Sequence, residues 1–346
     1  MNKYQFTIGD VSIGGNNPIS IQSMSDIKTE NISENIALTN DLAKRGLQLM
    51  RFSVLDEKDA LALKVIKKNV AVPIISDIHF SPKLAFLSLE SGVDKIRINP
   101  GNFPSLSLLR ELIRECKRRN VAIRIGVNAG SLNAFKGKTK SRADDMLLAL
   151  DDTLKVFQEE DFTHLVLSLK SSDPDLTEEL YLKAYEKYPY PLHVGLTESG
   201  LSLNGSIRST YALTKILQMG IGDTLRISLA DERKYEIRAC KELLKLTGRR
   251  ENVPTLIVCP SCGRTLIDLK EVANEVQDRL DFINKDIKVA VMGCPVNGIG
   301  EAKDAYCGIA GSGKKAVYLY FEYGKEVGLF EKEEAINRLF KAVEEA

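Results

Sequence analysis

The chain has 346 residues, 44% of them hydrophobic and 27% charged, a length and composition typical of a globular protein with one large and one smaller domain. Its net charge of +1 excludes a strong overall field for nucleic acid, and no apolar run approaches the roughly 18 residues of a membrane span. The N-terminal MNKYQFTIGDVSIGG lacks the apolar segment of a secretory signal, so we expect a cytoplasmic protein. Its six cysteines are then not a disulfide framework, and those that cluster indicate metal or redox chemistry.

Up to about residue 248, short apolar segments alternate with amphipathic segments. The short segments predict eight strands: Ile19–Met24, Leu49–Val54, Pro73–Ile78, Lys95–Asn99, Ala122–Val127, His164–Leu169, Pro191–Leu196 and Asp223–Leu229. The amphipathic segments predict helices at Ser33–Arg45, Asp56–Lys68, Ser105–Arg118, Arg142–Phe157, Leu176–Tyr188, Ser206–Met219 and Glu232–Leu246. Eight strand–helix units in about 250 residues match a (β/α)8 TIM barrel. An open doubly wound sheet is the alternative, although no GxGxxG follows the first strand.

A charged stretch, TGRREN at Thr247–Asn252, predicts a linker between two domains. We therefore expect a substrate-binding TIM-barrel domain at residues 1–248 and a smaller α/β domain at residues 249–346. The elements predicted for the smaller domain are strands at Thr255–Val258, Lys288–Val291 and Ala316–Glu322, and helices at Leu266–Leu280 and Glu331–Glu345.

The active site of such a barrel lies at the carboxyl ends of its strands. Polar side chains occupy these positions: Gln22 and Ser23; Arg51 and Ser53; Asp77 and His79; Arg97 and Asn99; Arg124 and Asn128; Ser168 and Lys170; His193, Thr197 and Glu198; Arg226 and Ser228. Five of them are cations: Arg51, Arg97, Arg124, Lys170 and Arg226. This excess predicts an anionic ligand with several oxygens, most simply a diphosphate, because guanidinium groups match phosphate geometry. The alternative is that each arginine pairs with a carboxylate from a helix.

The three histidines receive different predictions. His79, in the SDIHF loop at a strand end, is expected to be a site residue. His164 starts a strand and is expected to be structural, and for His193 both interpretations stay open.

Four of the cysteines fall in the smaller domain. Cys259 and Cys262 form a C-x2-C pair, and Cys294 lies in a loop rich in glycine and proline. One interpretation is a structural zinc with these three ligands and a fourth such as Cys307; the other is a [4Fe-4S] cluster with a fourth ligand from protein or substrate. Zinc sites usually show two paired knuckles, which favours the cluster. Cys116 and Cys240 lie on helical patterns and are expected to be buried, inert thiols.

The stretch from Gly308 to Lys315, GIAGSGKK, approaches the phosphate-binding pattern G-x4-G-K-[ST] but is one residue short. Lys315 stands where that pattern requires a hydroxyl for Mg²⁺, and no strand closely precedes the glycines. We expect no P-loop there, and the roles of this stretch and of Cys307 stay open.

Four motifs together carry a family resemblance: NPISIQSMS, HVGLTESG, CPSCGRT and MGCPVNGIGEA. Along essentially its whole length the chain resembles the 4-hydroxy-3-methylbut-2-en-1-yl diphosphate synthases, or GcpE family, of the short bacterial type. The resemblance implies a TIM barrel followed by a [4Fe-4S] cluster domain. It also implies reductive ring opening and dehydroxylation of 2-C-methyl-D-erythritol 2,4-cyclodiphosphate to 4-hydroxy-3-methylbut-2-enyl diphosphate in the non-mevalonate isoprenoid pathway, with electrons delivered through the cluster.

The resemblance further implies residue roles and partners. The implied cluster ligands are Cys259, Cys262, Cys294 and, as the fourth, Glu301; the implied substrate-binding residues are Arg51, Arg97, Arg124, Asn128, Lys170, Arg226 and Ser228. Glu198 is the expected acid/base, with Asp77 and His79 as further catalytic residues. The implied partners are flavodoxin or ferredoxin as electron donor and a second copy of the chain, the cluster domain of one copy capping the barrel of the other. A zinc-containing barrel transferase and a redox-sensing binding module are the alternatives.

Overall fold

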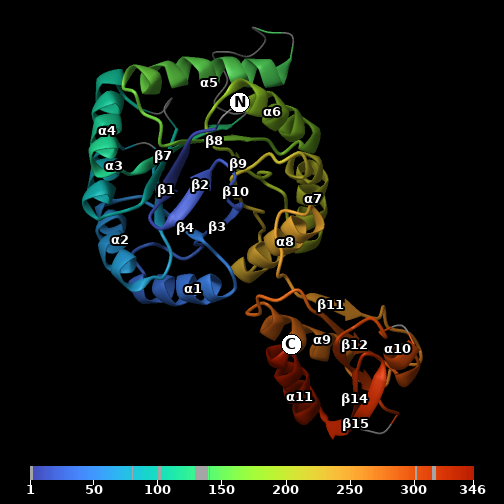
Figure 1. The fold of residues 1–346 in the computed structure, drawn as a ribbon. Helices are drawn as coiled ribbons and strands as arrows, with labels where there is room; N and C mark the ends of the chain where they lie inside the picture. The colour runs from blue at the N-terminus through green and yellow to red at the C-terminus, as the bar shows by residue number, and fades with distance from the viewer. Residues whose placement is uncertain are drawn as a thin grey trace. The chain divides into compact units, whose positions relative to one another are not determined.

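The computed structural model of the chain divides into two compact units, Met1–Arg250 and Glu251–Ala346 (Figure 1). It describes residues 3–79, 81–99, 103–128, 139, 141–300, 302–313 and 317–346. In this described part, no helix combines the length and apolar character needed to cross a membrane.

Eight parallel strands form the centre of the first unit. They are β3 (Ser20–Met24), β4 (Leu49–Ser53), β5 (Ile74–Asp77), β6 (Lys95–Ile98), β7 (Ala122–Asn128), β8 (Leu165–Lys170), β9 (His193–Val194) and β10 (Thr224–Leu225). Their order is β8-β7-β6-β5-β4-β3-β10-β9, and a parallel bridge between Leu167 and Leu192 joins the two ends of this sheet. The predicted TIM barrel is therefore confirmed, and the open-sheet alternative is wrong.

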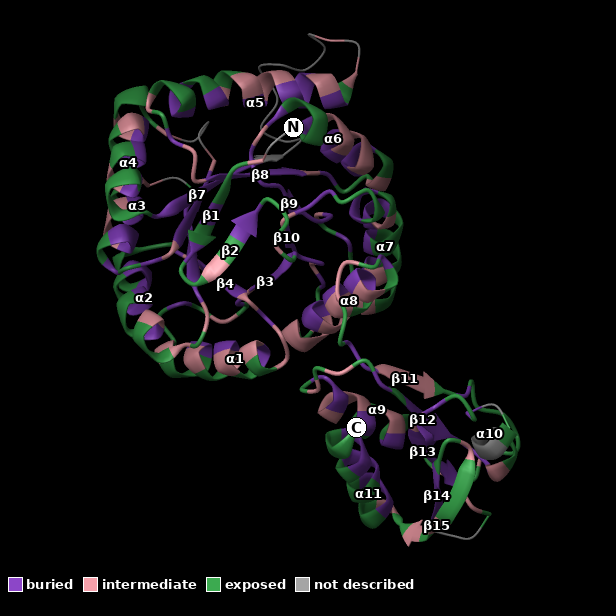
Figure 2. Cartoon of the chain, viewed as in Figure 1, coloured by how far each residue is buried: buried purple, intermediate pink, exposed green. Residues whose placement is uncertain are grey.

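Helices surround these strands as an outer ring (Figure 1). They are α1 (Ile32–Lys44), α2 (Glu57–Asn69), α3 (Pro82–Glu90), α4 (Leu106–Arg119), α5 (Arg142–Glu159), α6 (Pro174–Lys187), α7 (Ser202–Gln218) and α8 (Arg233–Leu246). The buried strands contrast with the exposed outer faces of the helices (Figure 2). Of these helices, α3 was not predicted. Its sequence, Pro82–Glu90, offers only about two turns of periodic apolar pattern.

The helix α4 shows how the sequence sets these elements. Ser105 caps its first turn by accepting a hydrogen bond from the Leu108 amide. Leu109, Leu112 and Cys116 then recur on one face and are buried against the strands. The helix ends at Asn120, whose φ of 57° is the left-handed conformation that asparagine tolerates at such ends.

An antiparallel hairpin, β1 (Gln5–Ile8) and β2 (Val11–Gly14), precedes the barrel and was not predicted. Its apolar side chains form one buried cluster with the first residues of the barrel strands: Phe6, Ile8, Ile13, Leu49, Ile75, Ala122 and Val166. The hairpin therefore closes the amino end of the barrel and leaves the carboxyl ends of the strands as its open end.

A five-stranded sheet of order β11-β12-β13-β14-β15 forms the second unit. Its elements are β11 (Thr255–Val258), α9 (Leu269–Leu280), β12 (Lys288–Met292), α10 (Pro295–Gly300), β13 (Cys307–Gly311), β14 (Val317–Glu322), β15 (Lys325–Glu331) and α11 (Lys332–Glu345). The strands β11, β12 and β13 run parallel, whereas β14 and β15 are antiparallel additions. The predicted smaller α/β unit is thus confirmed.

The prediction missed β13 and β15. Glycine weakens the strand pattern of β13, yet a Cβ at Gly308 would lie 2.4 Å from the Phe321 ring, so only glycine fits there. Gly308–Gly311 therefore belong to a strand paired on both sides, an arrangement unlike the loop of a phosphate-binding P-loop. Lys315 lies outside the described residues.

Candidate functional site

Cationic side chains gather at the open end of the barrel. Arg97, Arg124 and Arg226 are at most 9% exposed, and Arg51 is partly buried. The pairing register sets Arg97 on β6 directly beside Arg124 on β7, and a Cβ at Gly126 would lie 3.3 Å from Arg97 Nη2. Burying several like charges side by side is unfavourable unless anions balance them.

One buried carboxylate, Asp77 at the end of β5, balances part of this charge. Its oxygens lie 3.2 Å from Arg97 Nη1, 3.3 Å from His79 Nε2 and 3.6 Å from Arg51 Nη2. Burial alone would raise the pKa of Asp77, but Arg51, His79 and Arg97 together lower that pKa below its usual value. Asp77 is therefore ionised at neutral pH and holds three neighbouring site residues in place.

A second carboxylate, Glu236 on α8, was not predicted. It accepts hydrogen bonds from both Arg226 Nε, at 3.0 Å, and Arg226 Nη2, at 2.9 Å, and it also accepts from the Ser23 hydroxyl at 2.6 Å. For Arg226 the alternative of a helix carboxylate is therefore correct. The sequence does indicate this pair, because Glu236 stands on the apolar face of its helix, one turn from Cys240. A carboxylate on such a face is buried and therefore needs a partner.

Arg124 and Lys170 have no such carboxylate partner among the described residues. Arg124 Nε and Nη1 are buried without a hydrogen-bond partner. Burial, and then repulsion from neighbouring cations, lowers the pKa values of Arg124 and Lys170. Arg51 donates to Met24 Sδ at 2.7 Å in addition to its contact with Asp77, and burial lowers its pKa to about 10.

Lys95, two residues before Arg97, is a further buried basic side chain, which was not predicted as a site residue because it begins its strand and the site was expected at the strand ends. In the described part of the barrel, the interior thus holds six basic side chains against two buried carboxylates, Asp77 and Glu236; the basic residues are Arg51, Lys95, Arg97, Arg124, Lys170 and Arg226. Six minus two leaves an excess of four basic groups. Such an interior is suited to an anion that carries several negative charges.

Glu198 follows β9 and is exposed, so it is free to reach a ligand. Its φ of 54° lies in the left-handed region, where a non-glycine residue costs on the order of 1–3 kcal/mol and often marks a functional position. The neighbouring Ser199 hydroxyl donates to the Ser228 carbonyl at 2.8 Å, which ties this loop to the loop after β10. A Cβ at Gly195 would lie 2.6 Å from Lys170 Nζ, so glycine permits this lysine to pass close to β9.

His164 and His193 lie at the beginnings of two barrel strands. His164 precedes β8 and stacks on Phe6 of the hairpin at 4.9 Å, at the closed end of the barrel. His193 is fully buried, and its Nδ1 lies 2.8 Å from the Thr224 hydroxyl. The side chain of Asn128, which ends β7, lies outside the described residues.

Three cysteines gather at one edge of the second unit, where β11 and β12 end. Cys259 follows β11, and its Sγ accepts a hydrogen bond from the Gly293 amide at 3.2 Å. Gly293 directly precedes Cys294, so the Cys259 thiol lies beside the segment that carries Cys294, although Cys259 and Gly293 are 34 positions apart in sequence. Ser261, with φ of 61°, reverses the chain between Cys259 and Cys262, and the Leu266 amide donates to the Gly293 carbonyl at 2.8 Å.

The donor set fits an iron–sulfur cluster. Three thiols from two adjacent loops are accompanied by backbone amides that donate to sulfur, with Arg264 N lying 3.5 Å from Cys262 Sγ. No three His, Cys, Asp or Glu side chains of the described residues lie close enough together to hold a single metal ion. A four-iron cluster spreads its ligands over a wider volume than one ion does. Glu301, the implied fourth ligand, lies outside the described residues.

The other cysteines lie elsewhere. Cys307 pairs in register with Val289 on β12. Val289 precedes Cys294 by five residues, so Cys307 lies about 16 Å from Cys294 along the strand direction. It therefore cannot be the fourth ligand of a zinc site with Cys294 in this arrangement. Burial raises the pKa values of the Cys240 and Cys307 thiols to about 12 and raises that of Cys116 as well, as expected for inert thiols.

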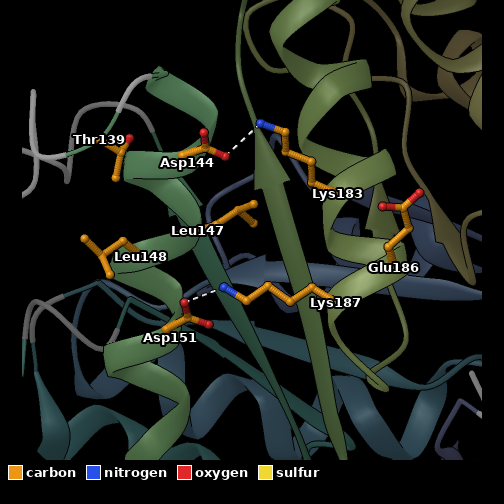
Figure 3. Close-up of a pocket in the computed structure, with 8 residues that line it drawn as sticks. All are labelled: Thr139, Asp144, Leu147, Leu148, Asp151, Lys183, Glu186 and Lys187. Carbon is orange, nitrogen blue, oxygen red and sulfur yellow. Dashed lines mark hydrogen bonds and ion pairs between the residues drawn. The ribbon is translucent and has the colours of Figure 1, made fainter.

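A surface groove of about 440 Å³ between α5 and α6 lies outside the barrel interior (Figure 3). Its lysines are paired with carboxylates, Lys183 with Asp144 at 2.7 Å and Lys187 with Asp151 at 2.5 Å (Figure 3). The groove therefore lacks the uncompensated charge of the barrel, and we place the candidate active site at the open end of the barrel.

Comparisons with known proteins assign both units to the same family. The family model "GcpE TIM-barrel domain" matches residues 3–241, and "GcpE protein C-terminal domain" matches residues 255–345. A 4-hydroxy-3-methylbut-2-en-1-yl diphosphate synthase (flavodoxin) of Macrococcus caseolyticus is 43% identical over 334 residues, 96% of this chain and 90% of the relative. The Bacillus subtilis protein of the same name is 42% identical over 339 residues, 97% of this chain and 89% of the relative.

Among solved structures, the barrel resembles a Yersinia pestis dihydropteroate synthase with a TM-score of 0.52 and 10% identity, covering 70% of this chain and 98% of that one. A truncated 3-deoxy-D-arabino-heptulosonate 7-phosphate synthase from Thermotoga maritima gives a TM-score of 0.50 at 14% identity, covering 71% and 94%. These similarities show the barrel fold alone.

Proposed function

Because the chain belongs to the GcpE family, we propose that it reduces 2-C-methyl-D-erythritol 2,4-cyclodiphosphate to 4-hydroxy-3-methylbut-2-enyl diphosphate in the non-mevalonate isoprenoid pathway. The observation that carries this proposal is the excess of buried basic groups at the open end of the barrel. A cyclic diphosphate dianion would neutralise part of that excess, and guanidinium forks match its oxygens. The reaction consumes two electrons and one proton and yields the diphosphate trianion and water.

The residues of the barrel would bind the substrate, orient the binding groups or donate a proton. Arg51, Arg97, Arg124, Lys170 and Arg226, with Asn128 and Ser228, would bind the diphosphate. Asp77 would keep Arg51, Arg97 and His79 oriented through the contacts described above. Glu198 would donate the proton to the C3 hydroxyl as it leaves as water, because a carboxyl group at a strand end can reach a ligand in the barrel.

Cys259, Cys262 and Cys294, with Glu301 as the fourth ligand, would hold a [4Fe-4S] cluster. When bound, such a cluster supplies the two electrons singly. We propose flavodoxin as the donor, in keeping with the names of the relatives, with ferredoxin as the alternative. We further propose a cytoplasmic homodimer in which the cysteine-bearing unit of one chain covers the barrel of the other.

Anaerobic purification followed by turnover tests this function. Roughly four iron and four sulfide per chain, broad visible absorption, and conversion of the cyclic diphosphate with a chemical reductant are the expected results. One zinc per chain without colour would instead support a barrel transferase, and ligand binding without consumption of reductant would support a sensor. Either result would overturn the proposed reaction.

Replacing Arg124 by methionine tests the phosphate-binding role. Because Nε and Nη1 of Arg124 have no partner among the described residues, Arg124→Met should weaken binding of the cyclic diphosphate about 10- to 100-fold without lowering the melting temperature. Arg226→Met is the matched comparison: it removes two of the hydrogen bonds to the buried carboxylate of Glu236, which keeps those from Arg233, Ser23 and the Leu229 amide, so it should also destabilise the fold by about 1–3 kcal/mol. Calorimetric titration and thermal unfolding measure both effects, and unchanged binding in Arg124→Met would contradict the role.

A further inference from the structure

Lys95, the first residue of β6, is a fully buried lysine to which the proposed reaction gives no role. It lies on the same face of the strand as Arg97, two residues earlier, and therefore about 7 Å deeper in the barrel. Its Nζ donates to Gln22 Oε1 at 3.3 Å. Gln22 belongs to β3, and β4 and β5 separate β3 from β6, so this contact crosses the interior of the barrel.

Among the described residues, the groups found to act on or lie beside Lys95 are neutral or basic. Ile75 on β5 and Ala122 on β7 lie directly beside it in register. The charged groups that act on its amine are Arg124 on β7 and Arg51 on β4, both of which repel a proton there. His193 on β9 experiences the charge of Lys95 in turn.

Asp77 on β5, a buried acid of the barrel, is already shared by Arg51, Arg97 and His79. The hairpin beneath offers the apolar side chains of Phe6, Ile8 and Ile13. An ammonium group in this place would thus keep a single amide oxygen, that of Gln22, as its hydrogen-bond partner within the described part of the chain. Burial first, and then Arg124 and Arg51, lower the pKa of Lys95 well below its ordinary value.

Other polar atoms in the same interior lack partners. Gln22 Nε2, His193 Nε2, and Arg124 Nε and Nη1 are buried without a hydrogen bond, and each belongs to a side chain at most 3% exposed. These side chains come from β3, β9 and β7, on different sides of the barrel. The interior around Lys95 therefore has unused capacity to donate hydrogen bonds and a potential that attracts anions.

We propose that Lys95 is a charge-compensating residue of the anion site, neutral in the ligand-free protein and protonated from solvent when a polyanion binds above it. The amine gains one proton and no other bond changes. Entry of negative charge removes the repulsion that keeps the amine neutral, so binding and proton uptake favour one another. The inference rests on the proposed function only in taking the barrel interior as the anion site.

The same coupling bears on the proposed reaction. Opening of the ring converts a diphosphate dianion into a trianion, and an ammonium at Lys95 favours the more highly charged form. Lys95 would then assist product formation through charge without contacting the reacting carbon.

Calorimetric titration of the anaerobically purified holoenzyme with inorganic sulfate tests this proposal. Sulfate is a dianion that does not itself titrate near neutral pH, so repeating the titration in buffers of different ionisation enthalpy counts protons taken up by the protein. Lys170, in the same interior, is a second lysine whose pKa is lowered. The proton uptake that belongs to Lys95 is therefore measured as the difference in proton count between wild type and Lys95→Met. Lys64→Met, on the exposed face of α2, is the control.

Wild type and Lys64→Met should each take up about one more proton per sulfate than Lys95→Met does, and their affinity for sulfate should fall more steeply as the pH rises. Lys95→Met should melt no lower than wild type, because the unfolded chain protonates this lysine and the folded chain disfavours it. Equal proton counts in wild type and Lys95→Met, or no uptake in wild type, would overturn the proposal. Since sulfate binding requires no turnover, an enzyme inactive toward the cyclic diphosphate could still confirm it.

Discussion

Cys262→Ser is expected to give colourless protein without measurable iron and without turnover of the cyclic diphosphate. Of the three clustered cysteines Cys262 is exposed, whereas Cys259 and Cys294 are buried, so serine at this position should leave the fold intact. Serine is a poor substitute for a thiolate ligand of iron. The loss of activity should exceed the roughly 10- to 100-fold that removal of a supporting outer contact costs. Iron and sulfide analysis, visible absorption and anaerobic assays measure the effect.

Cys307→Ala is the control within the same unit. Its thiol lies 3.8 Å from the Leu339 carbonyl oxygen on the α11 side of the sheet, and the register separates it from Cys294. This variant should remain brown and active, with at most a modest loss of stability from the small cavity. A brown, active Cys262→Ser protein would contradict the assignment of Cys262 as a cluster ligand. A colourless Cys307→Ala protein would indicate that Cys307, on β13, is a ligand instead.

Glu198→Gln is expected to lower kcat by about 10²- to 10⁴-fold, the usual contribution of a positioned acid or base. The amide keeps the shape and hydrogen-bonding capacity of the side chain but cannot donate the proton. Cluster content should be unchanged because Glu198 belongs to the barrel unit. The dissociation constant for the cyclic diphosphate should stay within a few-fold of wild type, since the basic groups that bind it are intact.

Glu232→Gln provides the matched comparison, because Glu232 is an exposed carboxylate in the loop that follows β10. It should turn over at the wild-type rate. If Glu198→Gln retained full activity, Glu198 would have no acid role. A parallel loss in both variants would point instead to a general effect of removing negative charge near the open end of the barrel.

Local patterns in the sequence predicted much of the fold. The eight barrel strands were anticipated within a few residues, because strands buried on both faces read as short apolar runs between turns. The hairpin at Gln5–Gly14 escaped prediction since its role is to cover the barrel floor, a surface that exists only once the strands have closed. Likewise, Cys307–Gly311 is a strand because pairing on both sides overrides its glycines.

By itself, the sequence determined the two-unit organisation, the basic residues at the strand ends and the C-x2-C loop, because each depends on spacing along a few neighbouring residues. Only the tertiary structure decided which groups meet. Glu236 joins Arg226 across the wall of the barrel, Lys95 reaches Gln22 through its interior, and Cys259 accepts a hydrogen bond from Gly293, just after the neighbouring strand. These contacts join residues that are distant in sequence, and the register and closure of the sheets create them.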